Sequence, residues 1–183
     1  MKTPLNTEIE EIPHAGLRLL TANALATAPA CFWTMPASTS GKYHPEFAAG
    51  AGGLVRHTKA VFYLVQHLLT LHDIGKGEPL YSLLLSAALL HDCCKAGTSG
   101  QMTCHEHPLL AAEHVEKTAR TLPPGTVDST LLRDLLRCIK SHMGRWNKSK
   151  HSAISLPLPR TFAEVLLHTA DYMASRKHIS IDI

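Results

Sequence analysis

Residues 80–94 read LYSLLLSAALLHDCC and decide the fold of this chain. Apolar residues occupy almost every position up to Leu90, so the stretch has no polar face of the kind that a surface helix carries. This composition predicts a helix buried on all sides, running from Leu80 to Cys94. Lys95-Ala96-Gly97 follows it with a basic residue and a glycine, which are typical of a helix end.

Apolar spacing on either side of this stretch is also helical. Leu54 to Leu71 has apolar residues three, four and seven positions apart, which predicts an amphipathic helix, and the Gly- and Pro-containing segment Asp73–Pro79 ends it. Residues 31–52 contain three glycines and two prolines and are expected to form a long connection. Further helices are expected at Leu17–Thr27, Pro108–Leu122, Asp128 or Ser129 to about His142, and Arg160–Lys177. Only the tail Ile179–Ile183 shows a short period-two alternation, so the pattern predicts an all-α bundle.

Length and composition favour one domain over residues 1–183, since 183 residues leave little room for a second core. No run of 18 apolar residues occurs, and the first residues lack the apolar segment of a signal peptide. The five cysteines are odd in number and form no C-x-x-C pair, which indicates a reducing compartment. We therefore expect a cytoplasmic protein without membrane contact.

Histidine is the most unusual feature of the composition, with 13 residues in the chain. His91-Asp92 lies at the end of the most apolar predicted helix, where a buried carboxylate is costly unless it is paired or binds a metal ion. Histidine is also the commonest metal ligand. Other expected helix ends or turns carry further residues of the same type, namely His57, His107, His142 and Asp171.

A second His-Asp pair, His72-Asp73, is rejected as a metal site. His72 follows His57 by 15 residues on what is expected to be one helix. At 1.5 Å per residue the two would be roughly 22 Å apart. Two ligands of one ion must each come within about 2.0–2.2 Å of it. The pair also lies in a polar, Gly-containing break, where exposure to solvent is expected.

The order of these residues resembles a known family. Gly-Gly-Leu-Val-Arg-His-Thr at 52–58, Ala-Ala-Leu-Leu-His-Asp-x-x-Lys at 87–95, and the later His107, His142 and Asp171 are similar to the pattern H…HD…H…H…D of the HD superfamily. The opening GGLxxHT resembles the HD domains of bacterial 3′–5′ exoribonucleases and of some conjugative relaxases. The resemblance covers about residues 50–177 and leaves 1–49 as an N-terminal helical extension and loop. It implies an HD-domain helical bundle.

The resemblance also implies a ligand set for one or two divalent metal ions. The first ion would be held by His57, His91, Asp92 and Asp171. Asp92 would bridge to a second ion, completed by His107 and His142. A water between the ions would attack phosphorus. Imidazole and carboxylate ligands without thiolate suit Mn, Fe, Co, Ni or Zn, with Mg as a further option.

Asp92 and Lys95 are the candidate catalytic residues, and Lys95 would neutralise a substrate phosphate one turn from His91. His105 is an alternative to His107 as a ligand, although Pro108 suits the first turn of a helix that begins beside His107. The family pattern often has Ile-Gly where this chain has Cys93-Cys94. That difference places two thiols close to the proposed ligands.

Residues 135–163 carry six Lys or Arg and no acid, which favours an anionic substrate. Arg145 and Lys148 follow His142 closely and are candidates for phosphate binding. Trp146 between them is a candidate for stacking a nucleic-acid base, and its alternative is a partly buried core position. A solvated basic loop is the alternative for the whole segment.

The resulting hypothesis is a metal-dependent phosphohydrolase or phosphodiesterase that hydrolyses a phosphoester of a nucleotide or of a short nucleic-acid end. Two alternatives remain open. An HD-type di-iron oxygenase would use the same ligands, and a catalytically silent module would bind a nucleotide or nucleic acid without turnover. The substrate, the number of metal ions and the oligomeric state, with a homo-oligomer among the options, are not determined at this level.

Overall fold

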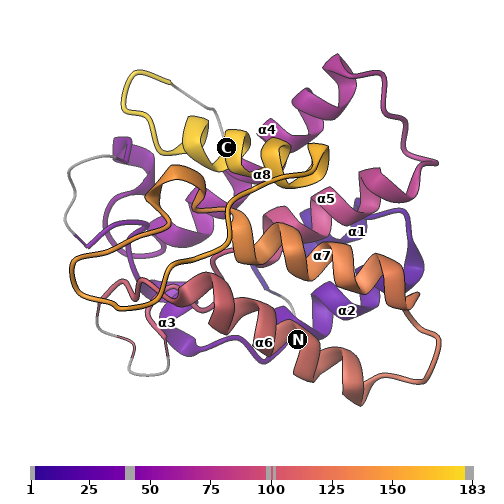
Figure 1. Ribbon diagram of the computed structural model, residues 1–183. Helices are drawn as coiled ribbons and strands as arrows, with labels where there is room; N and C mark the ends of the chain where they lie inside the picture. The colour runs from indigo at the N-terminus through magenta and orange to yellow at the C-terminus, as the bar shows by residue number, and fades with distance from the viewer. Residues whose placement is uncertain (1–2, 40–43, 98–99, 101, 180–183) are drawn as a thin grey trace.

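The computed structural model describes residues 3–39, 44–97, 100 and 102–179. Within these residues the chain forms eight α-helices, two short 3-10 helices and no strand, which confirms the all-α prediction (Figure 1). Residues 180–183 of the tail, where alternation was noted, lie outside the described part. No helix in the described part is both long and apolar enough to cross a membrane. The helices are α1 Asn6–Glu10, α2 Ala15–Ala26, α3 Ala30–Thr34, α4 Gly53–Leu71, α5 Pro79–Leu90, α6 His107–Thr121, α7 Ser129–Ser141 and α8 Phe162–Ala174, with 3-10 helices η1 Glu46–Ala48 and η2 Gly144–Trp146.

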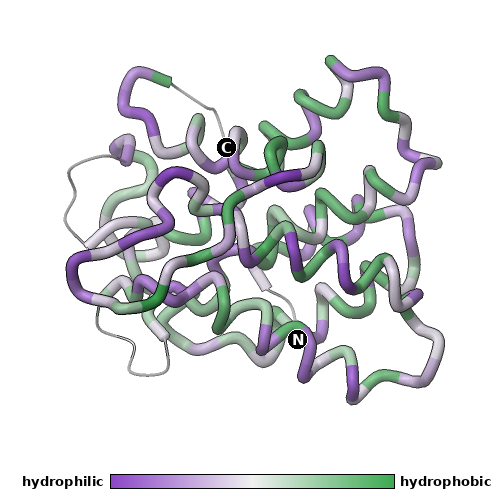
Figure 2. Tube along the Cα trace, viewed as in Figure 1, coloured by the Kyte–Doolittle hydropathy of each residue, from purple (hydrophilic) through white to green (hydrophobic). Residues whose placement is uncertain are grey.

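Helix α5 is the centre of the bundle and packs against α2, α4, α7 and α8. Its residues from Tyr81 to Leu90 are all buried, and Leu84, Leu85 and Leu89 have no exposed surface. Figure 2 shows hydrophobic residues concentrated along the helices at the middle of the molecule. The apolar stretch up to Leu90 therefore forms the buried core helix that its composition predicts.

The expected end of this helix at Cys94 is wrong by four residues. The α-helix stops at Leu90, and the chain continues to Gly97 in tight turns in which Cys93 N donates to Leu90 O and Lys95 N donates to Asp92 O. These bonds join residues three apart instead of four, so the backbone tightens after Leu90. The segment remains buried through Gly97, which is why its composition could not be distinguished from that of the helix before it.

Two other predictions need correction. The connection expected at 31–52 contains part of α3 and all of η1, and α1 was not predicted. These elements are only three to five residues long, too short for a hydrophobic period to be recognised. Helix α8 ends at Ala174 and not near Lys177. At this end the Ser175 hydroxyl donates to Tyr172 O at 2.7 Å. This side-chain bond uses a carbonyl at the helix end.

The start of α4 is set by a close backbone approach. Gly52 has φ of +70°, and a Cβ on Gly53 would lie 2.2 Å from Ala48 O. Gly50–Gly53 therefore form a tight turn, in which Gly53 N donates to Gly50 O, and this turn fixes where the helix that carries His57 begins. Helices α4 and α8 then run beside each other (Figure 1).

Candidate metal centre

Five segments bring their histidines and aspartates to one place inside the bundle. His57 lies in the second turn of α4, His91 and Asp92 directly follow α5, and Asp171 lies in the last turn of α8. His107 is the first residue of α6, and His142 is the C-cap of α7. All except the partly exposed Asp171 are buried.

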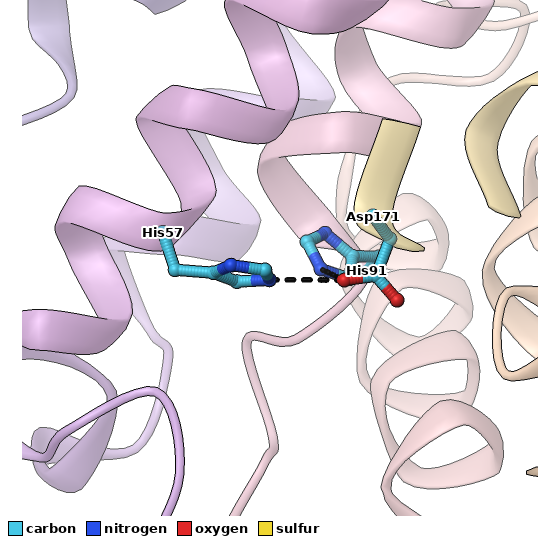
Figure 3. Close-up of side chains that lie close together, drawn as sticks. All are labelled: His57, His91 and Asp171. Carbon is cyan, nitrogen blue, oxygen red and sulfur yellow. Dashed lines mark hydrogen bonds and ion pairs between the residues drawn. The ribbon is translucent and has the colours of Figure 1, made fainter. Parts of the chain in front are cut away.

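One group of potential ligand atoms consists of His57, His91 and Asp171 (Figure 3). His57 Nε2 lies 3.0 Å from Asp171 Oδ1, and His91 Nε2 lies 3.8 Å from the same oxygen. In the close-up the carboxylate lies beside the His91 ring, with the His57 ring pointing toward it from α4.

A second group shares His91 and adds Asp92 and His142. Asp92 Oδ2 faces the first group, at 3.4 Å from His91 Nε2 and 3.8 Å from His57 Nε2. Asp92 Oδ1 faces the other way, at 2.9 Å from His107 Nε2 and 3.5 Å from His142 Nε2. The two oxygens of one carboxylate thus point to two different pairs of imidazoles.

These separations fit divalent metal coordination. Ligands that each lie 2.0–2.2 Å from an ion are at most about 4.4 Å from one another. The distances from the Asp92 and Asp171 oxygens to the surrounding Nε2 atoms lie between 2.9 and 3.8 Å. The buried His/Asp groups could therefore hold a metal ion without large side-chain movement.

Backbone contacts orient three of the imidazoles. Nδ1 of His91, His107 and His142 lies 2.8, 2.6 and 2.7 Å from the carbonyl oxygen three residues earlier in each case. A carbonyl oxygen can only accept, so Nδ1 carries the proton and the Nε2 lone pair faces the cluster. This arrangement is the usual outer support of a metal-bound histidine.

The cluster contains acceptor atoms that no protein donor satisfies. His91 Nε2 and Asp92 Oδ1 are buried without a hydrogen bond among the described residues. The His107 ring lies near Asp92 Oδ1, but its proton is on Nδ1 and is donated to Cys104 O instead. Nε2 of His107 and of His142 lie 3.1 Å apart although each presents a lone pair. Such a concentration of buried acceptors is costly unless a cation or protons enter it.

Lys95 supplies the one positive charge that the structure describes in direct contact with Asp92. Its Nζ lies 2.6 Å from Asp92 Oδ2, and the lysine side chain is only 10% exposed. Lys95 is three residues after Asp92, and the tight turns after α5 allow the two side chains to meet. Lys95 therefore lies next to the proposed ligands and forms an ion pair with one of them, Asp92.

Shifts in pKa leave most of the cluster in the ionisation state that a metal needs. Burial alone would raise the pKa of Asp92, but the Lys95 ammonium and the imidazoles hold it well below its usual range. Burial lowers the pKa of His107 to about 4 and also lowers that of His57, which Asp171 partly opposes. Burial acts the same way on His91, but the adjacent Asp92 carboxylate raises its pKa. Ionised carboxylates and neutral imidazoles are the forms that coordinate cations.

The rejected pair and the alternative ligand both lie away from the cluster. His72 and Asp73 are exposed at the end of α4, and the His72 ring packs edge-on against Phe162 with centroids 5.0 Å apart. His105 Nε2 approaches Ile154 O at 3.2 Å, whereas His107 approaches Asp92. The positions therefore favour His107 and the His91-Asp92 pair.

The predicted substrate residues are distributed unevenly. A cavity of about 320 Å³ opens beside the cluster and is lined by Lys95, Trp146 and Asp171, among others. Arg145 and Lys148 are exposed and are not among its described lining residues. Arg145 instead lies with its guanidinium carbon 5.0 Å from the Trp146 ring centroid.

Sequence analysis did not single out five of the residues that line this cavity, among them Tyr172, Arg176 and His44. Tyr172 and Arg176 line the same cavity and follow Asp171 on or just after α8. His44 lines it as well, with its ring 5.0 Å from that of His57, and burial lowers its pKa to about 3. Closeness to Asp171 in the sequence could have suggested Tyr172 or Arg176, but His44 follows a segment without any periodic signal.

Comparisons of the chain with protein-family models, with curated proteins and with solved structures gave no match.

Proposed function

We propose that the protein is an HD-type, metal-dependent phosphohydrolase that cleaves a phosphoester of a nucleotide or short nucleic-acid end. The observation that carries this proposal is the position of Asp92, whose two oxygens face two different pairs of imidazoles. A carboxylate that could bridge two sets of ligands suits a centre in which two ions act together on one phosphate.

The proposed ligands divide between two ions. One ion would take His57, His91, Asp92 and Asp171, and the other would take Asp92, His107 and His142. Bound divalent ions would activate a water for attack on phosphorus and stabilise the developing charge. The chain fixes the ligand orientation through the Nδ1 contacts of three histidines and keeps the carboxylates ionised.

Lys95 supports a phosphate substrate in particular. It lines the cavity as well as contacting Asp92, so its ammonium can move from the carboxylate to an incoming phosphate oxygen. Besides compensating the buried Asp92 carboxylate, a positive group that lines the cavity can stabilise an anionic substrate. A phosphate substrate favours phosphoester hydrolysis over an HD-type di-iron oxygenase, and a turnover assay distinguishes the enzyme from a silent binding module.

The proposal is tested by metal titration and by hydrolysis with Asp92→Ala and a matched control, Asp73→Ala. Asp73 also follows a histidine, but it is exposed and remote from the cluster. Calorimetric titration with Mn²⁺ should show binding in wild type and in Asp73→Ala, and at least a hundredfold weaker binding in Asp92→Ala. Hydrolysis of bis(p-nitrophenyl) phosphate and a nucleotide panel should follow the same order.

Two results would contradict the proposal. Mn²⁺ binding by Asp92→Ala at wild-type affinity would show that the cluster is not the metal centre. Substrate-dependent oxygen uptake by the Fe²⁺-loaded protein, without phosphate release from any member of the panel, would instead support the oxygenase alternative.

A further inference from the structure

We infer that the cavity beside the cluster binds the aromatic base of a mononucleotide-sized substrate against Trp146 and Tyr172. This inference rests on the proposed function, because it places the phosphate of the same molecule at the metal centre. It names the substrate class that the metal ligands alone leave open.

The cavity joins two chemically different walls. Asp171 and Lys95, which belong to the cluster, line the cavity together with Trp146 and Tyr172, which form an aromatic surface. Asp171 and Tyr172 are consecutive in α8, so a ligand group and the aromatic wall are held by the same turn of helix. One small molecule can therefore contact both.

The aromatic wall consists of two stacked rings. The Trp146 and Tyr172 rings are nearly parallel, at 18°, with centroids 5.4 Å apart. They come from η2 and α8, so the pair depends on packing between segments far apart in the sequence. Their exposed fractions are 39% and 38%, which is high for large aromatic residues that already pack on each other. An aromatic base would cover this surface by stacking.

Cations surround the stacked pair. The guanidinium carbon of Arg176 lies 4.4 Å from the Tyr172 ring centroid, and that of Arg145 lies 5.0 Å from the Trp146 ring centroid. Arg176 also lines the cavity. Since Lys95 also lines it, the cavity combines aromatic surface with positive charge, the combination expected for a base attached to a phosphate.

The size of the cavity limits the occupant. Its volume of about 320 Å³ lies near the lower end of the roughly 300–1,000 Å³ of ordinary small-molecule sites. One nucleotide unit is therefore the largest group that this space would enclose, and any further units would extend into solvent.

Fluorescence of Trp146 gives a direct test that does not require turnover. The chain has two tryptophans, and Trp33→Phe leaves Trp146 as the single reporter. Metal-free Trp33→Phe protein should show saturable quenching with adenosine and with adenosine 5′-monophosphate. Ribose 5-phosphate, which lacks the base, should cause no saturable change. Equal responses to all three compounds, or none to either compound that carries the base, would overturn the inference.

Substitutions of Tyr172 separate stacking from folding. Tyr172→Ala should weaken adenosine 5′-monophosphate binding roughly tenfold by calorimetry, since stacking on one ring contributes about this much. Tyr172→Phe should retain binding because the ring remains. Phe162→Ala is the matched control, since Phe162 is an exposed aromatic of α8 that is not among the described cavity residues. If Tyr172→Ala fails to fold, Trp146→Ala measured by calorimetry serves in its place.

The outcomes also distinguish this inference from the proposed function. Wild-type protein that binds Mn²⁺ and hydrolyses ribose 5-phosphate as well as adenosine 5′-monophosphate would retain the proposed function and exclude base recognition. Base-dependent quenching in a protein that neither binds metal nor hydrolyses phosphoesters would support the aromatic site and exclude the enzyme.

Discussion

Lys95 occupies the position of a counter-charge to Asp92 in the metal-free protein. Its Nζ is 2.6 Å from a carboxylate that is otherwise surrounded by imidazoles and is buried. Removing one partner of a buried ion pair leaves the other charge uncompensated, which is strongly destabilising. The same removal frees the carboxylate for a cation.

We therefore predict that Lys95→Met lowers the stability of the metal-free protein by up to about 3 kcal/mol and that Mn²⁺ restores most of it. Urea unfolding with and without Mn²⁺ measures both effects. The increase in stability on adding Mn²⁺ should be larger in Lys95→Met than in wild type. Turnover of a phosphoester should fall in the same variant, because the phosphate loses a positive contact.

Lys59→Met provides the control. Lys59 pairs with the buried Glu8 at 2.9 Å. It follows His57 by two residues on α4, so its side chain lies on a different face of the helix from that ligand. Its loss should destabilise the protein, and Mn²⁺ should not restore that loss. Rescue of both variants by Mn²⁺ would indicate a general salt effect and would contradict the role assigned to Lys95.

At the scale of elements, the junction between α7 and α8 positions His142. The His168 ring from α8 packs over Gly144, and its Nδ1 lies 2.7 Å from His142 O, so it donates to that carbonyl. A Cβ on Gly144 would lie 2.2 Å from the His168 ring, and Gly144 has φ of +53°. Both the space and the backbone conformation therefore require glycine here.

Gly144→Ala should destabilise the protein by about 2–3 kcal/mol and weaken Mn²⁺ binding at the His107–His142 side of the cluster. Gly125→Ala is the matched control, because Gly125 has φ of +81° with no other atom close to the added Cβ. That variant should lose only about 1 kcal/mol, the strain of the positive φ alone, and keep its metal affinity. Equal losses of stability in urea unfolding would show that His168 packing contributes nothing.

At the scale of the whole molecule, the proposed second ion site depends on how α5, α6 and α7 pack together. Asp92 follows α5, His107 begins α6 and His142 caps α7. We predict that calorimetry detects two Mn²⁺ sites in wild type and one in His142→Ala. His105→Ala should keep two, since His105 contacts Ile154 O outside the cluster. One site in both wild type and His142→Ala would indicate a mononuclear centre.

Much of the molecule could be predicted from local patterns. Apolar periodicity located the long helices to within a few residues, because the period of a helix is a local property of the chain. The order of His57, His91-Asp92, His107, His142 and Asp171, together with helix length, was also enough to separate them from His72-Asp73. The errors occurred where elements are short, at the end of α8, and where α5 tightens into turns without a change in hydrophobicity.

The sequence by itself determined the all-α class, the buried central helix and the six candidate ligands. Only the tertiary structure decided that the two oxygens of Asp92 face different imidazole pairs and that Lys95 binds Asp92. It alone also brought His44 to the cluster and stacked Trp146 on Tyr172. The physical reason is that helix formation depends on residues that are neighbours in the sequence. These contacts instead join side chains from different segments or depend on the exact course of a turn, and both are set by how the whole bundle packs.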